Sequence, residues 1–255
     1  MKMEECRAIV TGGASGLGEA TVRNIVQKGG KTVIFDLSEE SGQRLQKELG
    51  ESVLFLKADV TKEVNIQESV RKASEFMGGI NSLINCAGIA IAEKVIGRKG
   101  VHDLSLFSRV INVNLIGSFN VLRIVAENMI SNEPNDQDER GVIINTASVA
   151  AFEGQIGQAA YSASKGGIVG MTLPIARELA RYGIRVMAIA PGLFHTPMFN
   201  TLPQEAKESL GKMVPFPSRL GYPSEYAQLV QSIIENPMLN GETIRLDGAI
   251  RMQPK

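Results

Sequence analysis

Apolar residues along the chain follow two alternating patterns. Short runs rich in valine and isoleucine, such as 31–36, 53–60 and 184–190, are typical of strands buried on both faces of a sheet. Further strands are expected at 81–88, 142–148 and 242–248. Between the strands, apolar residues recur at helical spacing, which predicts amphipathic helices. The expected helices include residues 39–49, 62–77, 104–130, 158–182 and 224–237.

The alternation of strands and helices predicts the fold class. Parallel strands need a crossover connection, usually a helix, and such crossovers are right-handed. The sequence therefore predicts an α/β fold with a Rossmann-like doubly wound parallel sheet between two helical layers. At 255 residues, and without an internal repeat, the chain is expected to form a single domain over residues 1–255.

Composition and charge argue against several classes of protein. Apolar residues make up 44% of the chain, and 27 basic residues balance 27 acidic ones, so we expect neither a nucleic-acid nor a membrane partner. No apolar run is expected to approach the ~20 residues that span a bilayer, and the amino terminus leaves no room for a signal peptide. Cys6 and Cys86 lack metal-ligand spacing and fit a reducing compartment. We therefore expect a cytoplasmic protein without a metal site.

A glycine-rich turn follows the first strand. Its order Gly12-x-x-x-Gly16-x-Gly18 stands between that strand and a helix that continues to Gly29 or Gly30. Glycines at such a turn let the backbone approach a pyrophosphate, and the free N–H groups at the start of the helix favour the anion. The turn therefore predicts a dinucleotide-binding site.

Asp36 ends the second strand, eighteen residues after Gly18. Dinucleotide-binding folds place at this point the acid that binds the adenosine ribose hydroxyls. Its charge would repel a 2′-phosphate, and neither 13–15 nor 37–38 contains an Arg or Lys that could offset the repulsion. The sequence therefore predicts NAD rather than NADP as the cofactor.

Other residues near strand ends extend the expected cofactor site. Asp59 either meets the adenine amino group or caps the helix that follows. The small residues of 85–88 suit a backbone that lies against the cofactor, and Cys86 is interpreted as a small buried hydrophobe. Phe194 and Thr196 are placed to touch the nicotinamide end, where Thr196 could bond the carboxamide.

Candidate catalytic residues lie within the segment 158–172 and shortly before it. Tyr161 and Lys165 stand four residues apart and so share one face of a helix, while Ser148 ends the strand 142–148. A tyrosine ordinarily ionises near pH ~10, and a neighbouring cation lowers its pKa. Together the three side chains could polarise a carbonyl, donate a proton and take one back. A Tyr-x-x-x-Lys spacing alone is common on solvated helices, so this hypothesis depends on the accompanying motifs.

Two further segments have open interpretations. Asn114, in the apolar middle of 104–130, either ties down a helix kink or bridges through water to Lys165. The loop 89–103 carries cations that either meet substrate phosphates or are ordinary solvated charges. These cations are Lys94, Arg98 and Lys99. The segment 131–141 is expected to be an acidic surface loop.

The segment at about 193–220 has prolines, methionines and phenylalanines at no steady period. This composition predicts an apolar lid over the site. His195 lies within it, and His102 lies in the loop 89–103. Both histidines are interpreted as surface residues rather than as an acid or base.

The motifs occur in an order and spacing that resemble the short-chain dehydrogenase/reductase family from Arg7 to Met252. The residues that carry the resemblance are TGGASGLG, NCAG, NVNLIG with Asn114, Ser148, YSASK and the PG after the sixth strand. Two later segments, VPFPSRLG and NGETIRLDGAIRMQP, are similar to the 3-hydroxyacyl-CoA dehydrogenase branch of that family. The departures are Cys86 in place of a second Asn and a terminal DGA in place of DGG.

The resemblance implies an NAD-dependent oxidoreductase of fatty-acid metabolism that interconverts a 3-hydroxyacyl-CoA and a 3-oxoacyl-CoA. It implies that Tyr161 is the general acid/base, Lys165 lowers its pKa and holds the nicotinamide ribose, Ser148 orients the substrate oxygen and Asn114 anchors a water relay. Such proteins are usually tetramers with the Tyr161 helix at an interface. The expected NAD-binding residues are Gly12, Ser15, Gly16, Leu17, Gly18, Asp36, Asp59, Val60, Cys86, Ala87, Gly88, Tyr161, Lys165, Pro191, Phe194 and Thr196.

Other functions are compatible with the same residues. The substrate is expected to be a small molecule, with an acyl-CoA thioester favoured over a hydroxysteroid or another secondary alcohol. A 3-oxoacyl-carrier-protein reductase is less favoured because Asp36 disfavours NADPH. A scaffold that binds NAD without catalysis is opposed by the presence of Ser148, Tyr161, Lys165 and Asn114 together.

Overall fold

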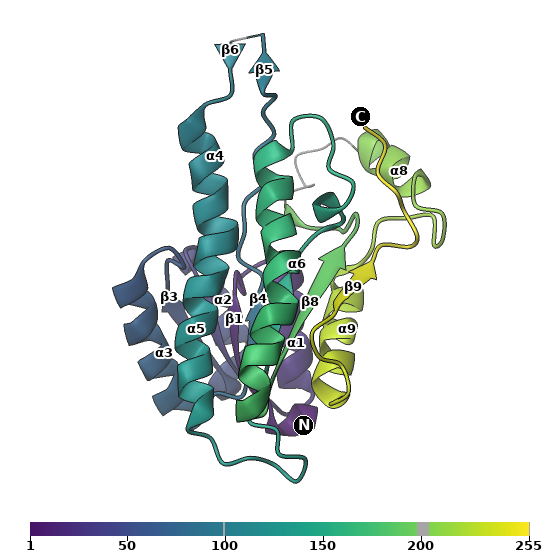
Figure 1. Cartoon of the computed structure of the whole chain (residues 1–255). Helices are drawn as coiled ribbons and strands as arrows, with labels where there is room; N and C mark the ends of the chain where they lie inside the picture. The colour runs from purple at the N-terminus through teal and green to yellow at the C-terminus, as the bar shows by residue number, and fades with distance from the viewer. Residues whose placement is uncertain (99, 198–203, 255) are drawn as a thin grey trace.

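A seven-stranded parallel sheet lies at the centre of the structure, in the order β3-β2-β1-β4-β7-β8-β9 (Figure 1). The computed structural model describes residues 1–98, 100–197 and 204–254. The strands of this sheet are β1 (Arg7–Thr11), β2 (Lys31–Asp36), β3 (Val53–Lys57), β4 (Ser82–Asn85), β7 (Gly141–Thr146), β8 (Ile184–Pro191) and β9 (Thr243–Leu246). The order reverses between β1 and β4, where ligands bind in such sheets. The predicted doubly wound α/β fold is confirmed.

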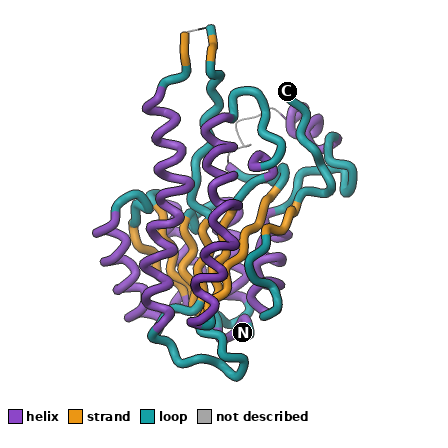
Figure 2. Tube along the Cα trace, in the orientation of Figure 1, coloured by secondary structure: helices purple, strands orange, loops and turns teal. Residues whose placement is uncertain are grey.

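Helices cover both faces of the sheet and form the outer layers (Figure 2). The described α-helices are α1 (Gly16–Gln27), α2 (Glu39–Leu49), α3 (Glu63–Met77), α4 (Leu104–Ile111), α5 (Ser118–Ile130), α6 (Ala159–Leu179), α8 (Gln204–Lys212) and α9 (Pro223–Glu235). Helices α3, α5 and α6 supply buried residues to one apolar cluster, and α1, α2 and α9 to another. The described 3₁₀ helices are Met3–Glu5, Gly50–Ser52, Val149–Ala151 and Ala180–Tyr182.

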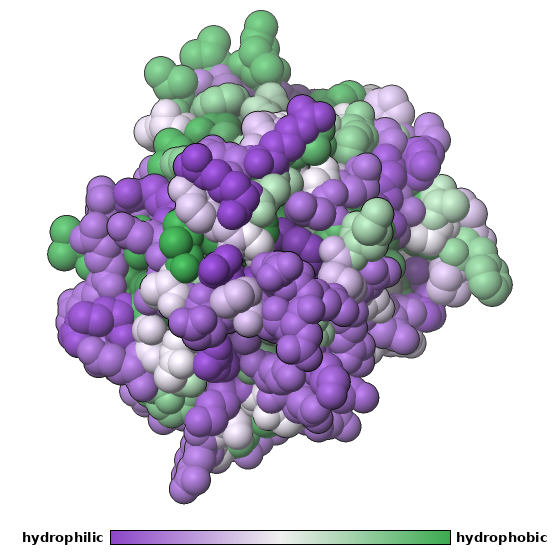
Figure 3. Space-filling view, turned by 60° about the horizontal axis from the view of Figure 1, so that its bottom comes forward, coloured by the Kyte–Doolittle hydropathy of each residue, from purple (hydrophilic) through white to green (hydrophobic). Residues whose placement is uncertain are grey.

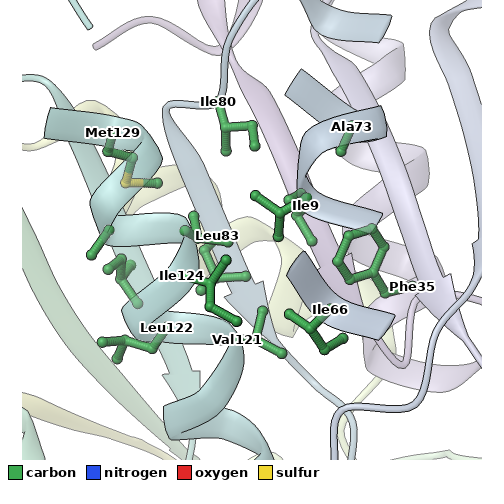
Figure 4. Packing of buried hydrophobic residues seen from close by; sticks show 14 of the residues in the cluster. Ile9, Phe35, Ile66, Ala73, Ile80, Leu83, Val121, Leu122, Ile124 and Met129 are labelled. Carbon is green, nitrogen blue, oxygen red and sulfur yellow. The ribbon is translucent and has the colours of Figure 1, made fainter. Parts of the chain in front are cut away.

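In most strands of the sheet, successive side chains alternate between these two apolar clusters. In β1, Ile9 belongs to the cluster shown in Figure 4, whereas Ala8 and Val10 belong to the other. In β2, Phe35 belongs to the same cluster as Ile9, and Ile34 belongs to the same cluster as Ala8 and Val10. Successive side chains of a strand point to opposite faces, so a sheet covered on both faces needs apolar residues throughout. Each such side chain contributes about 1.5–3 kcal/mol on burial, which explains the continuous apolar runs in the sequence.

The long helix expected at 104–130 is interrupted in its middle. Residues Asn112–Gly117 form a π-helix between α4 and α5. The stretch Leu104–Ile130 is long and apolar enough to cross a membrane, so the expectation that no run approaches that length was wrong. More than half of its most apolar window, 56%, is buried inside the protein, as in the core helix of a soluble fold. The buried apolar residues of α5 belong to the apolar cluster on one face of the sheet.

The loop expected at 89–103 contains a small antiparallel hairpin. Its strands are β5 (Ile96–Gly97) and β6 (Gly100–Val101), and the hairpin projects beyond the helices (Figure 1). Lys94 and Arg98 are exposed there, while Lys99 lies outside the described residues. The opposite end of the molecule, near the amino terminus, presents a mainly hydrophilic surface (Figure 3).

Candidate active site

A cavity of about 740 Å³ opens at the carboxyl ends of the parallel strands. Because all seven strands run in one direction, the residues that follow them meet at this edge. The cavity brings together most of the expected site residues. Those that line it are Gly12, Ser15, Gly16, Leu17, Gly18, Asp36, Asp59, Val60, Cys86, Ala87, Gly88, Ser148, Tyr161, Lys165, Pro191, Phe194 and Thr196.

The glycine turn needs residues without a side chain. Gly12 and Gly16 have φ angles of 62° and 54°, in the left-handed region that favours glycine. A Cβ on Gly18 would lie 2.2 Å from the carbonyl oxygen of Gly12. The side chain of Ser15, at the N-cap of α1, makes no capping hydrogen bond, so it leaves the first N–H groups of α1 available. These features fit the phosphates of a dinucleotide.

Asp36 is held at the edge of the cavity by backbone groups. Its two carboxylate oxygens accept hydrogen bonds from Ala14 N at 3.0 Å and from Ser38 N at 2.9 Å. The carboxylate retains lone pairs for further donors, such as ribose hydroxyls. Among the described residues that line the cavity, only Arg109 and Lys165 are cationic, and neither belongs to the segments flanking Asp36. This arrangement fits a cofactor without a 2′-phosphate.

Asp59 does not cap the helix that follows it. One carboxylate oxygen accepts hydrogen bonds from Thr61 N at 2.9 Å and Thr61 Oγ1 at 2.7 Å. The N-cap of α3 is Lys62, so Asp59 closes the turn that precedes the helix. It also lines the cavity, and the contact with adenine stays a prediction.

Ser148, Tyr161 and Lys165 converge from two elements. Ser148 follows β7 and caps the 3₁₀ helix Val149–Ala151, where its Oγ accepts a hydrogen bond from Ala150 N at 3.1 Å. Tyr161 lies on α6 and shares a side-chain hydrogen bond with Ser148. The Lys165 Nζ lies 5.8 Å from the centre of the Tyr161 ring and donates to Thr146 O at 2.7 Å. The cavity therefore holds an acid, a polar hydroxyl and a cation in one place.

Burial controls the protonation of this group. It lowers the pKa of Lys165 from its ordinary 10.5 to about 8, because a buried ammonium loses hydration. Burial also raises the pKa of Tyr161, although the hydrogen bond with Ser148 acts in the opposite direction. The net direction for Tyr161 is therefore opposite to the lowering expected from Lys165, whose ammonium donates to the Thr146 carbonyl. Tyr161 is therefore a neutral proton donor at neutral pH.

Asn114 lies in the π-helical segment and ties that segment to the chain after β4. It donates to Ile89 O at 2.9 Å and to Ser164 Oγ at 3.1 Å, and it accepts from Ile89 N at 2.8 Å. The side chain is fully buried and is not among the described residues that line the cavity. The structure supports the first of the two interpretations, while the water relay stays a prediction.

The two histidines and the described cations of the loop 89–103 are not among the described residues that line the cavity. His195 is exposed, as predicted, and stacks on Tyr222 at a centroid distance of 5.5 Å. The prediction for His102 was less accurate, because its side chain is only 13% exposed and its Nδ1 lies 3.3 Å from Glu93. Lys94 and Arg98 of the hairpin do not line the cavity among the described residues.

The expected lid is only partly described. Residues 198–203, within 193–220, lie outside the described residues. Phe194 is 5% exposed and forms a bridge with Gly221, and Val214 is 4% exposed, so these parts of the segment pack into the fold. Leu210 on α8 lines the cavity. Closure of a lid stays a prediction.

Sequence reasoning missed several residues that line the cavity. These residues include Arg109, Gln155, Gln158, Leu210 and Met252. Arg109 stands one helical turn before Val113, which also lines the cavity, so the helix face could have indicated it. Met252 reaches the site because the tail is tied to the loop after Ser148, through Ile156 N to Pro254 O at 3.0 Å. Nothing in the sequence pattern shows that contact.

The fold and this cavity define a nucleotide-dependent oxidoreductase, and the comparisons agree. The family model described as short chain dehydrogenase matches residues 7–207, and the chain belongs to that family. Within the described residues, no group of three or more His, Cys, Asp or Glu side chains could hold a metal ion. The protein is a dehydrogenase that uses NAD(H), with the glycine turn and Asp36 as the residues that fit the cofactor.

Individual relatives carry more specific names than the family does. The chain is 61% identical over 249 residues to the 3-hydroxyacyl-CoA dehydrogenase type-2 of Bos taurus, covering 97% of this chain and 95% of the relative. It is 59% identical, with the same coverage, to the protein of that name from Homo sapiens. The crystal structure of 3-hydroxyacyl-CoA dehydrogenase type-2 from Mycobacterium avium matches with a TM-score of 0.94 and 41% identity, over 97% of this chain and 96% of the other.

Proposed function

We propose that this protein is an NAD-dependent 3-hydroxyacyl-CoA dehydrogenase, which interconverts a 3-hydroxyacyl-CoA and a 3-oxoacyl-CoA. The observation that carries the proposal is the joint presence of Ser148, Tyr161 and Lys165 in the cavity that also contains the glycine turn and Asp36. The similarity to dehydrogenases of this name over nearly the whole chain supports the choice of substrate.

The geometry gives each side chain a role in the reaction. When bound, NADH supplies a hydride and NAD⁺ accepts one. In reduction, neutral Tyr161 donates its proton to the substrate oxygen at C3, and the Ser148 hydroxyl donates a hydrogen bond to the same oxygen. In oxidation, the Tyr161 phenolate takes the hydroxyl proton, and the Lys165 ammonium favours that phenolate. The raised pKa of Tyr161 suits the reductive direction.

The experiment follows NADH absorbance as the purified protein meets acetoacetyl-CoA, with NADPH and a 17-ketosteroid in parallel reactions. The proposal predicts rapid oxidation of NADH by acetoacetyl-CoA, with slower turnover for NADPH and the steroid. Faster turnover of the steroid would favour the alternative secondary-alcohol dehydrogenase. Preference for NADPH would contradict the role of Asp36, and no turnover beside normal NADH binding would exclude the acyl-CoA substrate.

Arg109 is a candidate for binding the phosphates of a CoA thioester. The residue is exposed and lines the cavity, and its guanidinium makes no hydrogen bond or ion pair with another described residue. A free guanidinium is suited to bidentate binding of a phosphate. We expect Arg109→Gln to raise the KM for acetoacetyl-CoA about tenfold, since a hydrogen bond to a charged group is lost. Steady-state rates on that substrate provide the measurement.

Two controls locate the effect of Arg109. The CoA-free thioester S-acetoacetyl-N-acetylcysteamine should keep its KM in the Arg109→Gln variant, because it carries no phosphate. The hairpin variant Arg98→Gln should keep the KM for acetoacetyl-CoA, since Arg98 lies away from the cavity. A rise in the KM for NADH would place Arg109 on the cofactor, and a change with Arg98→Gln would restore the hairpin as the phosphate site.

We also propose a homotetramer that works in the reducing cytoplasm in fatty-acid metabolism. Support for assembly comes from large apolar side chains exposed on neighbouring helices, including Ile116 at 52%, Phe119 at 46% and Leu173 at 43%. Such exposed apolar surface is typical of interfaces between subunits. We expect sedimentation of the purified protein to give the mass of four chains, and a monomer of 27.5 kDa would contradict this proposal.

A further inference from the structure

A buried hydrogen-bonded group from α9 lies behind the catalytic lysine. Tyr226 is 0% exposed, and its hydroxyl lies 2.7 Å from Thr146 Oγ1 and 3.6 Å from Cys86 Sγ. The Thr146 hydroxyl also donates to Cys86 Sγ at 3.6 Å. The phenol, the hydroxyl and the thiol therefore form one cluster, and Cys86 and Thr146 line the cavity.

Thr146 connects this cluster to the reaction site. Its carbonyl oxygen accepts the hydrogen bond from Lys165 Nζ at 2.7 Å, so one residue contacts Tyr226 with its side chain and Lys165 with its backbone. Thr146 is the last residue of β7, and Ala147 N still bonds Ile189 O at 2.7 Å across the sheet. The hydroxyl of Tyr226 adds a second contact to Thr146, from helix α9 on the face of the sheet opposite α6.

We propose that Tyr226 is a positioning residue that holds Thr146, and through it the Lys165 ammonium, in place beside Tyr161. The inference rests on the proposed dehydrogenase reaction. It gives α9 a role in the active site, although Tyr226 itself is not among the described residues that line the cavity.

The charge state of the neighbours makes the Thr146 carbonyl important. The titratable groups that face Lys165 are Tyr161 on its own helix and Cys86 from the chain after β4, with Tyr226 on α9 behind them. Burial raises the pKa of all three, so at neutral pH they are uncharged. With no anion among them, the ammonium depends on its carbonyl acceptor.

The sign of the expected pH effect follows from this dependence. A displaced carbonyl disfavours the charged lysine and lowers the pKa of Lys165 below its value of about 8. A weaker cation beside Tyr161 stabilises its phenolate less, so the pKa of Tyr161 rises. Oxidation needs the phenolate, and its pH–rate profile should therefore move to higher pH.

Tyr226→Phe tests the hydroxyl while keeping the ring in the apolar cluster around α9. We expect about a three- to tenfold lower kcat for 3-hydroxybutyryl-CoA oxidation at pH 7, the equivalent of one lost hydrogen bond. The apparent pKa of that profile should rise, and the NADH dissociation constant, measured by fluorescence, should increase because Lys165 is displaced. Thermal unfolding should show that the variant stays folded.

A double-mutant cycle separates positioning from packing. Thr146→Val removes the other end of the same hydrogen bond, so the double variant should be no slower than Thr146→Val alone. Tyr182→Phe, on the 3₁₀ helix after α6, is the matched control and should keep the wild-type profile. A wild-type pH profile and NADH affinity in Tyr226→Phe, or full additivity in the cycle, would overturn the inference. If the wild type itself fails to turn over 3-hydroxybutyryl-CoA, the proposed function fails. The comparison of NADH affinity between the wild type and Tyr226→Phe then still tests the role of Tyr226.

Discussion

Tyr161→Phe is expected to lower kcat for acetoacetyl-CoA reduction by about 10²–10⁴-fold, the usual contribution of a general acid. The variant loses only the phenolic hydroxyl, so the substrate oxygen receives no proton from α6. NADH binding should be nearly unchanged, because the glycine turn and Asp36 remain in place. Steady-state absorbance gives kcat, and fluorescence titration gives the NADH dissociation constant.

Tyr182→Phe is the control for this substitution, since Tyr182 lies outside the described lining of the cavity. It should keep the wild-type kcat. A Tyr161→Phe variant that reduces acetoacetyl-CoA at a rate within threefold of wild type, about 0.7 kcal/mol, would contradict the assignment of Tyr161 as the acid.

Glu139→Ala is expected to destabilise the fold by about 3–5 kcal/mol, because it leaves a buried arginine without its anion. The side chains of Glu139 and Arg185 are 5% and 8% exposed, and their charged groups lie 2.7 Å apart. Arg185 also donates to the carbonyls of Ile233 and Ile234 near the end of α9, and to that of Leu239 after the helix. The pair therefore anchors the helix that carries Tyr226. Thermal unfolding should show a loss of roughly 6–20 °C in Tm.

Glu133→Ala is the matched control for this stability effect. Glu133 lies in the same segment, 131–141, but is exposed, so its removal should change stability by less than about 0.5 kcal/mol. Equal Tm values for Glu139→Ala and the wild type would show that the buried pair contributes nothing to stability.

The local sequence pattern predicted those features that depend on residues close together in the chain. Alternating strands and helices sufficed for the parallel sheet, because each crossover restricts its own pair of strands. The turn at Gly12 and the acid at Asp36 could be placed from strand ends alone. Tyr161 and Lys165 could be paired because helical spacing brings residues four apart onto one face.

Features that depend on distant contacts could not be predicted. The segment 131–141 is typical of an acidic surface loop, yet Glu139 in it is buried and pairs with Arg185 of β8. The sequence shows a polar Asn114 within an apolar stretch. It does not show the hydrogen bonds of Asn114 to Ile89 or the π-helix around it, because both depend on contact with the chain that follows β4. Tyr226 reads as one more apolar position of α9, and only the structure shows its hydroxyl at Thr146.

The expected pKa of Tyr161 shows how burial changes a prediction from spacing. A lysine four residues away suggests a lowered pKa, since the spacing specifies proximity. The same spacing does not show that Tyr161 is buried or that Lys165 donates to Thr146 O at 2.7 Å. Both facts disfavour the phenolate form of Tyr161 and so raise its pKa. Both depend on how the rest of the chain packs around α6.

Transfer of deuterium tests the proposed reaction most directly. The purified protein is mixed with acetoacetyl-CoA and NADH that carries deuterium at both C4 positions of the nicotinamide, and the acyl-CoA product is examined by mass spectrometry. The proposal predicts 3-hydroxybutyryl-CoA that contains one deuterium at C3, formed by the wild type and only in trace by Tyr161→Phe. Product without deuterium, or no product beside normal NADH binding, would contradict hydride transfer to a 3-oxoacyl-CoA in this cavity.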